Sequence, residues 1–184
     1  MNIFIGIGNP GKKYQNNRHN VGHIFIDYLV KKLTSWRVSE LKERNFSIAK
    51  IFSFDNLILC QTLTYMNESG KAVKKILKTL HVPRSTLYII HDDLDIPLGK
   101  FKIQFANGPK LHNGIKSIEE TLKTKDFWRI RIGVDNRKKE NWIDGETYVL
   151  QNFLDEEKEI LINEVFSKII NNHLEIPPKF IFNF

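Results

Sequence analysis

Four asparagines lie beside glycines at points where the chain is expected to turn: Asn9, Asn20, Asn67 and Asn113. Any one of them is typical of a turn, because asparagine tolerates left-handed backbone angles and its side chain bonds to the local backbone. As a group they favour a second interpretation. An amide side chain both donates and accepts hydrogen bonds, which suits a site that binds peptide groups and stabilises an oxyanion without adding charge.

His19 and Asp92 are the residues best suited to proton transfer beside these amides. A neutral imidazole with one nitrogen bonded to a carboxylate can take a proton from water with its other nitrogen. Such general-base help is typically worth about 10²–10⁴ in rate. The sequence has no serine in a G-x-S-x-G pattern, and Cys60 lies inside an apolar run. We therefore expect water to be the attacking group, without a covalent nucleophile.

Two patterns suggest other chemistry. Residues 6–11 form a G-x-G-x-x-G, but the main helical pattern begins only near Val21, and Pro10 lacks the amide proton that a phosphate would meet. The run of residues 91–95 (His-Asp-Asp-Leu-Asp) could hold Mg²⁺ through its oxygens, and it equally fits a strand end followed by a turn. We favour a functional role for Asp92, because functional groups collect past the carboxyl ends of strands in α/β sheets, and we expect no metal site.

The positive charge is concentrated in the first three quarters of the chain. Residues 1–139 carry 25 Lys and Arg against 12 Asp and Glu, whereas residues 140–184 carry 3 against 9, for a net charge of +7. A body this basic indicates a polyanionic partner, nucleic acid first, although charged helix faces that serve solubility give the same composition.

Composition also limits the compartment. One cysteine excludes a disulfide framework within the chain. No apolar run approaches the ~20 residues that a membrane span needs, and the first residues do not resemble a signal peptide. We therefore expect a cytoplasmic protein with no membrane association.

Hydrophobic periodicity predicts alternating strands and helices. Strands are expected at residues 2–7, 46–54, 57–63, 87–90, 100–105 and 128–134, and helices at 21–33, 69–80 and 115–122. A last helix should begin with Asp155 as its N-cap, carry an apolar stripe of Leu161, Val165 and Ile169, and stop before Pro177-Pro178. Asp55-Asn56 predicts a tight turn between two strands, so a purely parallel sheet is not expected. The predicted fold is a single α/β domain over residues 1–184, a three-layer sandwich in which a twisted mixed β-sheet has helices on both faces.

Six segments, in order, resemble bacterial-type peptidyl-tRNA hydrolases: residues 6–22, 64–73, 89–103, 112–118, 129–133 and 148–153. Co-linear motifs over about 150 residues are far more specific than any one of them. The resemblance implies a cofactor-free enzyme, usually monomeric, that hydrolyses the ester between a peptide and the 3′-terminal ribose of tRNA. Its substrate and partner would be peptidyl-tRNA.

The resemblance also implies a role for individual residues. His19 would activate water and Asp92 would orient and polarise it. Binding of the substrate would fall to Asn9 and Asn67 at the peptide backbone and scissile carbonyl, Asn113 near the terminal nucleotide, Tyr14 and Met66 along the cleft, and Arg131 at a tRNA phosphate.

The sequence departs from the family's pattern at two places. A glycine-rich loop normally precedes His-Asn-Gly, whereas residues 107–111 read Asn-Gly-Pro-Lys-Leu. The lysine that normally accompanies Arg131 on the phosphate is Gln104, and a neutral amide does not replace an ammonium there. We expect Lys102, on the same strand face, or Lys110 to substitute. The family has a lid in the region after Lys139, so residues 140–175 are expected to form an acidic lid and C-terminal helix, or simply a solvated helix.

Two other functions stay open from the sequence. The altered loop and Gln104 would fit an RNA-binding protein of the same fold with weak or lost activity. Asp92, Asp93 and Asp95 would fit a Mg²⁺-dependent nuclease or phosphohydrolase, which would lose all activity in a chelator.

Overall fold

The computed structural model of the 184-residue chain describes residues 2–35, 41–54, 57–138, 140 and 142–173. The turn expected at Asp55-Asn56 and the helix end expected at Pro177-Pro178 lie outside these residues. No helix in the described ranges is long and apolar enough to cross a membrane.

One mixed seven-stranded sheet forms the centre of the molecule, in the order β2-β3-β4-β1-β5-β7-β6. The strands are β1 (Asn2–Gly6), β2 (Lys42–Phe46), β3 (Ala49–Phe54), β4 (Leu57–Thr62), β5 (Leu87–Pro97), β6 (Phe101–Phe105) and β7 (Trp128–Asp135). The four central strands β4, β1, β5 and β7 are parallel to one another. The outer strands β2, β3 and β6 pair antiparallel. The mixed sheet that the hairpin pattern predicted is therefore confirmed.

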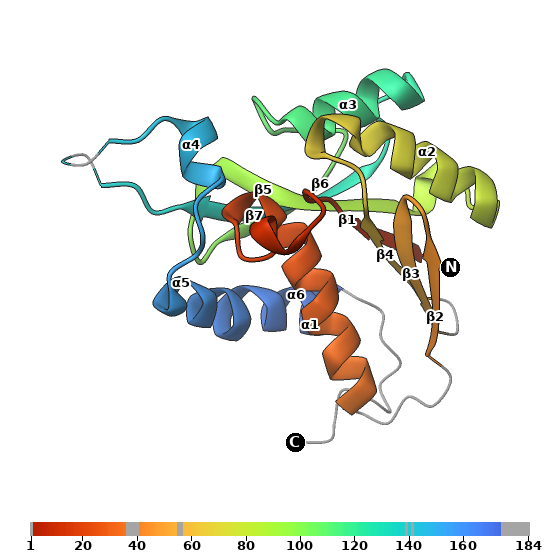
Figure 1. The fold of residues 1–184 in the computed structure, drawn as a ribbon, viewed down its shortest axis with the longest axis horizontal. Coiled ribbons are helices and arrows are strands. Elements are labelled where there is room, and N and C mark those ends of the chain that lie inside the picture. The colour runs from red at the N-terminus through yellow and green to blue at the C-terminus, as the bar shows by residue number, and fades with distance from the viewer. Residues whose placement is uncertain (1, 36–40, 55–56, 139, 141, 174–184) are drawn as a thin grey trace.

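Helices cover both faces of this sheet (Figure 1). The helices are α1 (Val21–Ser35), α2 (Ser69–Leu80), α3 (Asn113–Leu122), α4 (Gly145–Val149), α5 (Asp155–Ile160) and α6 (Ser167–His173), with a π-helical segment η6 (Leu161–Phe166) that joins α5 to α6. The described residues also include the 3₁₀ turns η1 (Lys12–Tyr14), η2 (Arg18–Asn20), η3 (Met66–Glu68) and η4 (Arg84–Thr86). Figure 1 shows α2 and α3 above the sheet and α1, α5 and α6 below it, which confirms the three-layer fold.

The sheet separates two hydrophobic cores because successive side chains of a strand point to opposite faces. Ile3 and Ile5 of β1 belong to the core beneath α2 and α3, whereas Phe4 between them belongs to the core of α1, α5 and α6. Each core buries fully inaccessible aromatic side chains, Phe127 in the first and Phe25 and Phe166 in the second. Strands that are apolar on both faces follow directly from this arrangement.

Helix α1 lies close against the central strands because Gly22 has no side chain. A Cβ at this position would collide with the backbone carbonyls of Ile7 and Ile90. The buried residues Phe25, Leu29 and Leu33 then continue along one helix face into the core, as the periodicity predicted. The close approach fixes the turn that precedes the helix, where His19 lies.

Two strand predictions need correction. The strand expected at 87–90 continues to Pro97, so Asp92 and Asp93 lie inside β5, opposite Ile132 and Gly133 of β7, and not in a turn after it. Pairing with β7 satisfies the backbone there, whatever the side chains are. The strand expected at 46–54 is β3, which begins only at Ala49, and Phe46 instead ends the separate strand β2. Strand β2 was missed because all five of its residues are exposed, which leaves no hydrophobic alternation to detect.

The C-terminal helix is also slightly different from the prediction. Asp155 is its first residue and Leu154 precedes it as the N-cap, because Glu157 accepts a hydrogen bond from the Leu154 amide at 3.0 Å and so closes the first turn. The predicted stripe of Leu161, Val165 and Ile169 is buried.

Candidate active site

The carboxyl ends of the central parallel strands open into one cleft of about 780 Å³. The loop after β1 brings Asn9, the loop after β4 brings Met66 and Asn67, and β5 itself brings Asp92. Asn113 enters at the start of α3, and the α4 segment closes another side with Glu146. Ligands of open α/β sheets bind at this edge.

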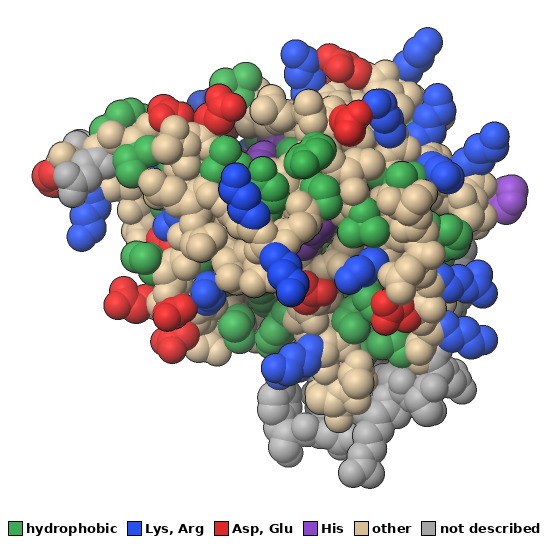
Figure 2. Space-filling model, in the orientation of Figure 1, with side chains coloured by type: hydrophobic (Ala, Val, Ile, Leu, Met, Phe, Trp, Pro, Cys, Tyr) green, Lys and Arg blue, Asp and Glu red, His purple; other side chains and the backbone are tan. Residues whose placement is uncertain are grey.

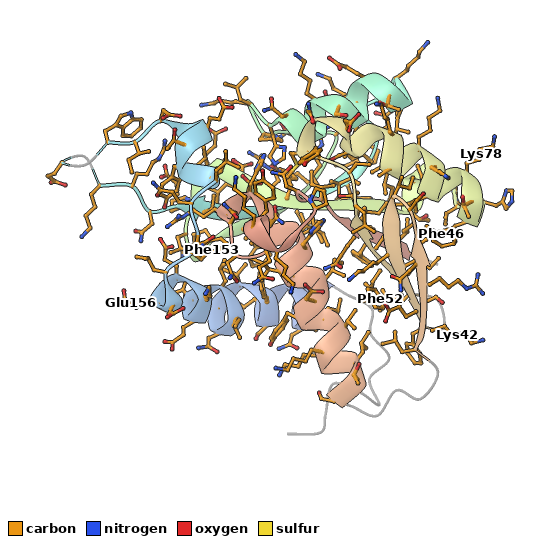
Figure 3. The ribbon with its side chains drawn as sticks, viewed as in Figure 1. Lys42, Phe46, Phe52, Lys78, Phe153 and Glu156 are labelled. Atoms are coloured by element: carbon orange, nitrogen blue, oxygen red, sulfur yellow. The ribbon has the colours of Figure 1, made fainter. Side chains whose placement is uncertain are left out.

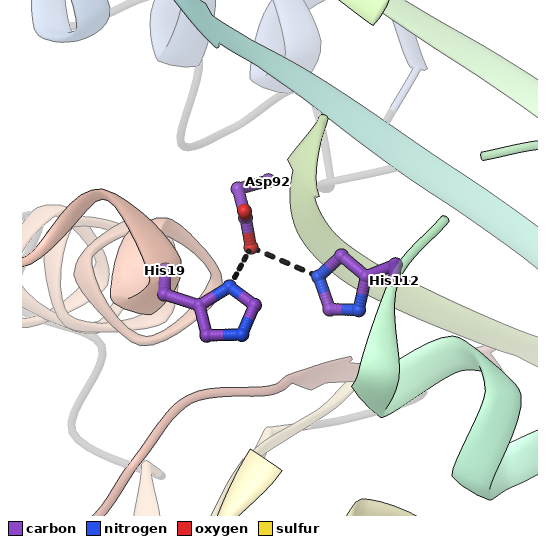
Figure 4. A group of neighbouring side chains, drawn as sticks. All are labelled: His19, Asp92 and His112. Carbon is purple, nitrogen blue, oxygen red and sulfur yellow. Dashed lines mark hydrogen bonds and ion pairs between the residues drawn. The ribbon is translucent and has the colours of Figure 1, made fainter. Parts of the chain in front are cut away.

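Three side chains meet at the base of the cleft (Figure 4). The Oδ1 atom of Asp92 lies 2.9 Å from Nδ1 of His19 and 2.9 Å from Nε2 of His112. The side chains of Asp92 and His112 are each 3% exposed, whereas that of His19 is 12% exposed and lines the cleft. The predicted pair of His19 and Asp92 is therefore brought together, with a second histidine on the same carboxylate oxygen.

Hydrogen bonding fixes the protonation of His112. Its Nδ1 accepts the backbone N–H groups of Gly114 at 3.0 Å and Ile115 at 3.3 Å, so the proton of the neutral ring is on Nε2, which donates to Asp92. His112 thus caps α3 and holds Asp92 at once. Sequence reasoning could have found the capping role, since a polar residue directly before an apolar-periodic helix is a capping position.

Asp92 in turn determines which nitrogen of His19 is free. With the carboxylate ionised, Nδ1 of His19 must be the donor, and Nε2 keeps its lone pair when the ring is neutral. Burial opposes the charged form of His19, but the charge and hydrogen bond of Asp92, with a contribution from Glu146, raise its pKa above the ordinary 6.5. Burial alone would raise the pKa of Asp92, yet His19 and His112 hold it well below its usual range. The arrangement can therefore remove a proton from water.

A third histidine, His91, packs beneath the cluster of His19, Asp92 and His112. It is completely buried, its Nδ1 donates to the backbone carbonyl of Asp92 at 2.6 Å, and its ring meets that of His112 edge to face at 4.8 Å. Burial lowers the pKa of His91 well below the ordinary value. It acts as a neutral packing residue beneath the cleft.

The turn that carries His19 is tied to the C-terminal part of the chain by Arg18. The Arg18 guanidinium donates to Glu157 at 2.6 Å and to the carbonyl of Asn152 at 2.9 Å, and it lies over the ring of Tyr148 at 4.2 Å. The Arg18 amide also donates to the carbonyl of Gln151 at 3.0 Å. Both partners of the ion pair are buried. Sequence patterns cannot find this contact, because Arg18 and Glu157 lie 139 positions apart.

Asn9 lines the cleft, and hydrogen bonds to neighbouring residues fix its position. Its backbone amide donates to Oδ1 of Asn20, whose Nδ2 donates back to the Asn9 carbonyl, both at 2.9 Å. The Asn9 Oδ1 accepts the amide of Met66 at 2.8 Å, so its Nδ2 donors are directed to other partners. With the Asn9 amide engaged and 3₁₀ turns ahead of α1, the G-x-G-x-x-G loop does not form a phosphate-binding helix start.

The remaining predicted substrate contacts divide into two groups. Asn67 and Asn113 are exposed and line the cleft, and Met66 lines it from a buried position. Tyr14 lies in η1, outside the residues that line the cleft, with Lys13 over its ring at 5.4 Å. Its predicted role stays a prediction.

The predicted phosphate contacts lie beside the cleft. Arg131 is 7% exposed, and its guanidinium donates to Asp93 at 2.7 Å and to Gln104 at 2.6 Å. Gln104 therefore accepts from Arg131, which a lysine at that position could not do. Lys102 is exposed on the same strand, and the ammonium of Lys110 lies 3.7 Å from Asp95.

Buried arginines also hold the loop that replaces the family's glycine-rich segment. Gly108 adopts a positive φ of 65°, and its carbonyl accepts a hydrogen bond from Arg129. A Cβ at Gly108 would collide with the guanidinium of Arg131, and the positive φ also favours glycine at this position. The amide of Lys110 donates to Asp95 at 3.3 Å. The loop beside Asn113 is thus positioned by cations instead of by glycines.

The acids of β5 do not converge on a cation. Asp93 bonds to Arg131 and to the amide of Asp95, while Asp95 faces Lys110. In the part of the chain that the structure describes, the group of possible metal ligands is His19, Asp92 and His112. The nitrogen of His112 that faces Asp92 carries a proton, so the group is satisfied as a hydrogen-bonded chain and not as a set of free lone pairs.

Fold and site together define a class of protein. A buried carboxylate holds an imidazole toward a cleft rich in neutral amides, at the carboxyl edge of a mixed α/β sheet. This arrangement of side chains is the one that a hydrolase needs to activate water with a general base. A protein-family model described as peptidyl-tRNA hydrolase matches residues 3–177, and the chain belongs to that family.

Individual relatives agree with the family model. The chain is 40% identical over 169 residues to a peptidyl-tRNA hydrolase of Geobacillus thermodenitrificans, covering 90% of this chain and 87% of the relative. It is 42% identical over 162 residues to one of Sulfurihydrogenibium, covering 88% and 83%. The crystal structure of peptidyl-tRNA hydrolase from Acinetobacter baumannii superposes with a TM-score of 0.75 at 25% identity, over 92% of this chain and 86% of that one.

Proposed function

We propose that this protein hydrolyses the ester between a peptide and the 3′-terminal ribose of tRNA, which returns the tRNA to translation. The observation that carries the proposal is the cluster of His19, Asp92 and His112 in the cleft of a chain that belongs to the peptidyl-tRNA hydrolase family. A hydrolase of this kind needs a base for water, and the cluster supplies one.

In the reaction that we propose, Nε2 of His19 takes a proton from water while the water oxygen attacks the ester carbonyl carbon. The tetrahedral intermediate then breaks its bond to the ribose 3′ oxygen, which receives the proton from Nε2. The products are the peptide acid and tRNA with a free 3′ hydroxyl. Asp92 stays ionised throughout, since it steadies the imidazolium that forms.

The amides around the cleft are assigned to binding in this proposal. Asn9 has its Oδ1 engaged by Met66, so its NH₂ group is suited to donate to a carbonyl oxygen of the substrate. Asn67 would contact the peptide and Asn113 the terminal nucleotide, from exposed positions on the cleft. Arg131, Lys102 and Lys110 would lie near phosphates. Tyr14 keeps its proposed place at the edge of the substrate.

The segment 140–175 is assigned to a lid and C-terminal helix, with α4 as the part that meets the cleft. Because peptidyl-tRNA forms during translation, we expect the protein to act in the cytoplasm. We expect it to work as a monomer, as the resemblance to the family implies.

The two competing functions have less support. A protein with lost activity would not need the buried bonds that hold Asp92 and His19 in a reactive arrangement. A nuclease built on Asp92, Asp93 and Asp95 would need these carboxylates together, but Arg131 and Lys110 occupy the second and third.

The test is release of the blocked amino acid from N-acetyl-aminoacyl-tRNA in EDTA, with unblocked aminoacyl-tRNA as the control. Cleavage of the blocked substrate alone supports the proposal. Cleavage that disappears in EDTA would support the metal-dependent alternative. Binding of tRNA without any cleavage would support the RNA-binding alternative.

A further inference from the structure

Helix α2 carries an unusual row of like charges on its exposed face. Lys71, Lys74, Lys75 and Lys78 are all exposed, opposite the buried face formed by Val73, Ile76 and neighbouring apolar residues. The helix contains no acidic residue. Like charges three or four positions apart repel each other, so this face is less stable than a mixed one would be.

Two lysines in or next to other helices pair with acids. Lys158 of α5 pairs with Asp155, and Lys125 after α3 pairs with Glu119. On α2, Lys71 pairs with Glu68 at 2.5 Å, but Lys74, Lys75 and Lys78 have no acidic partner among the residues that the structure describes. The exposed face of α2 thus carries four lysines and no acid of its own, whereas α1, α3 and α5 each contain acidic residues.

The lysines of α2 lie on a helix that begins beside the cleft. Helix α2 follows directly on η3, whose Met66 and Asn67 line the cleft, and it packs along α3, whose first residue Asn113 lines it too. Twelve residues give a helix about 18 Å long, so the lysines lead from the cleft mouth outward. Figure 3 shows Lys78 near the far end of α2, and Figure 2 shows lysine and arginine side chains gathered over this part of the surface.

The side of the molecule formed by α4 and α5 is acidic. Glu146 of α4 lines the cleft, and α5, on the other face of the sheet, carries exposed Asp155, Glu156 and Glu159 (Figure 1). Figure 3 places Glu156 on the side of the molecule away from Lys78. A phosphate backbone that leaves the cleft is repelled by the acidic side of the molecule and attracted by the lysines of α2.

We propose that the exposed face of α2, with Lys74, Lys75 and Lys78, binds the sugar-phosphate backbone of the substrate tRNA outside the cleft. This inference rests on the proposed function. The lysines bind phosphates, so they position the tRNA and carry no sequence information. Each neutralised phosphate releases condensed counterions, which makes binding weaken steeply as salt increases.

The experiment compares K74Q/K75Q/K78Q with the wild-type protein on two substrates between 50 and 200 mM KCl. One substrate is full-length N-acetyl-aminoacyl-tRNA, and the other is the same blocked amino acid on a short 3′-terminal oligonucleotide. Because the variant lacks three phosphate-binding ammonium groups, the magnitude of the slope of log kcat/KM against log salt should fall by about 2.7, at about 0.9 for each phosphate. Wild-type kcat/KM should then drop roughly 40-fold more than that of the variant over this range. The short substrate should be cleaved equally by both proteins.

The matched control is K31Q/K158Q/K168Q, which removes three lysines from α1, α5 and α6 on the other face of the sheet. This control should keep the wild-type slope on full-length tRNA. An unchanged slope for the α2 variant, or an equal change in the control, would overturn the inference. Failure of the wild-type protein to cleave either substrate would instead overturn the proposed function.

Discussion

The base of the cleft and its mouth differ in how fully their polar groups are bonded. At the base, Asp92 accepts from His19 and His112, and His112 accepts two helix amides. At the mouth, Asn67 and Asn113 are exposed, and the side chain of Leu111 is 94% exposed. The hydrogen bonds that position the reacting groups therefore form before the substrate binds. The exposed amides at the mouth form their hydrogen bonds with the substrate itself. Preorganised groups are expected to determine kcat, and exposed groups to determine binding.

The largest effect should follow from removing the base. His19→Ala should lower kcat by about 10²–10⁴-fold, because no other group takes the proton from water. Binding of tRNA should stay nearly unchanged, since His19 is not among the residues assigned to substrate binding. Single-turnover hydrolysis and a tRNA-binding assay measure the two quantities separately. A wild-type kcat in this variant would refute the assignment.

The next largest effect should follow from breaking the buried ion pair between Arg18 and Glu157, which ties down the turn that carries His19. Glu157→Gln should lower the free energy of unfolding by about 3–5 kcal/mol, because it leaves the buried guanidinium of Arg18 without its counter-ion. Denaturant unfolding measures the change. Lys158→Gln is the control, since its exposed pair with Asp155 should contribute less than about 1 kcal/mol. Equal losses in the two variants would contradict the buried anchor.

Asp92→Asn should reduce kcat less than His19→Ala, because a poorly oriented imidazole still accepts a proton. It should also move the pH profile. The rate needs neutral His19, so in the wild-type protein kcat/KM should fall as pH drops through a pKa above 6.5. Without the carboxylate, burial remains and favours the neutral ring, so the acidic limb should move to lower pH. A limb that does not move would show that Asp92 does not set the pKa of His19.

The smallest effect is expected at the mouth. Asn67→Ala should lower kcat/KM by about 2–13-fold, the range for loss of one hydrogen bond of about 0.5–1.5 kcal/mol, mainly through KM. Asn45→Ala on the edge strand β2 is the matched control and should have no effect. A decrease as large as that of His19→Ala would mean that Asn67 belongs to the chemistry and not to recognition.

Some features of the fold and of the cleft could be predicted from the sequence, and others could not. The strand and helix pattern, the mixed sheet and the pairing of His19 with Asp92 followed from periodicity and residue types. The second histidine on Asp92 did not, because the bond joins positions 20 apart and exists only after β5 and α3 come together. The extra length of β5 was missed for a similar reason, since β7 pairs with a stretch whose side chains are polar. The residue types suggested a partner for His19 but none for His112, so the second of these distant polar contacts could not be predicted.

The role of His19 as the base is tested most directly by an ¹⁵N NMR titration of its ring in the free protein. We expect a neutral ring protonated on Nδ1, with Nε2 titrating at a pKa above 6.5 because Asp92 accepts a hydrogen bond from the opposite nitrogen. A neutral ring protonated on Nε2, or a pKa below 6.5, would contradict the proposal that this imidazole is positioned to take a proton from water.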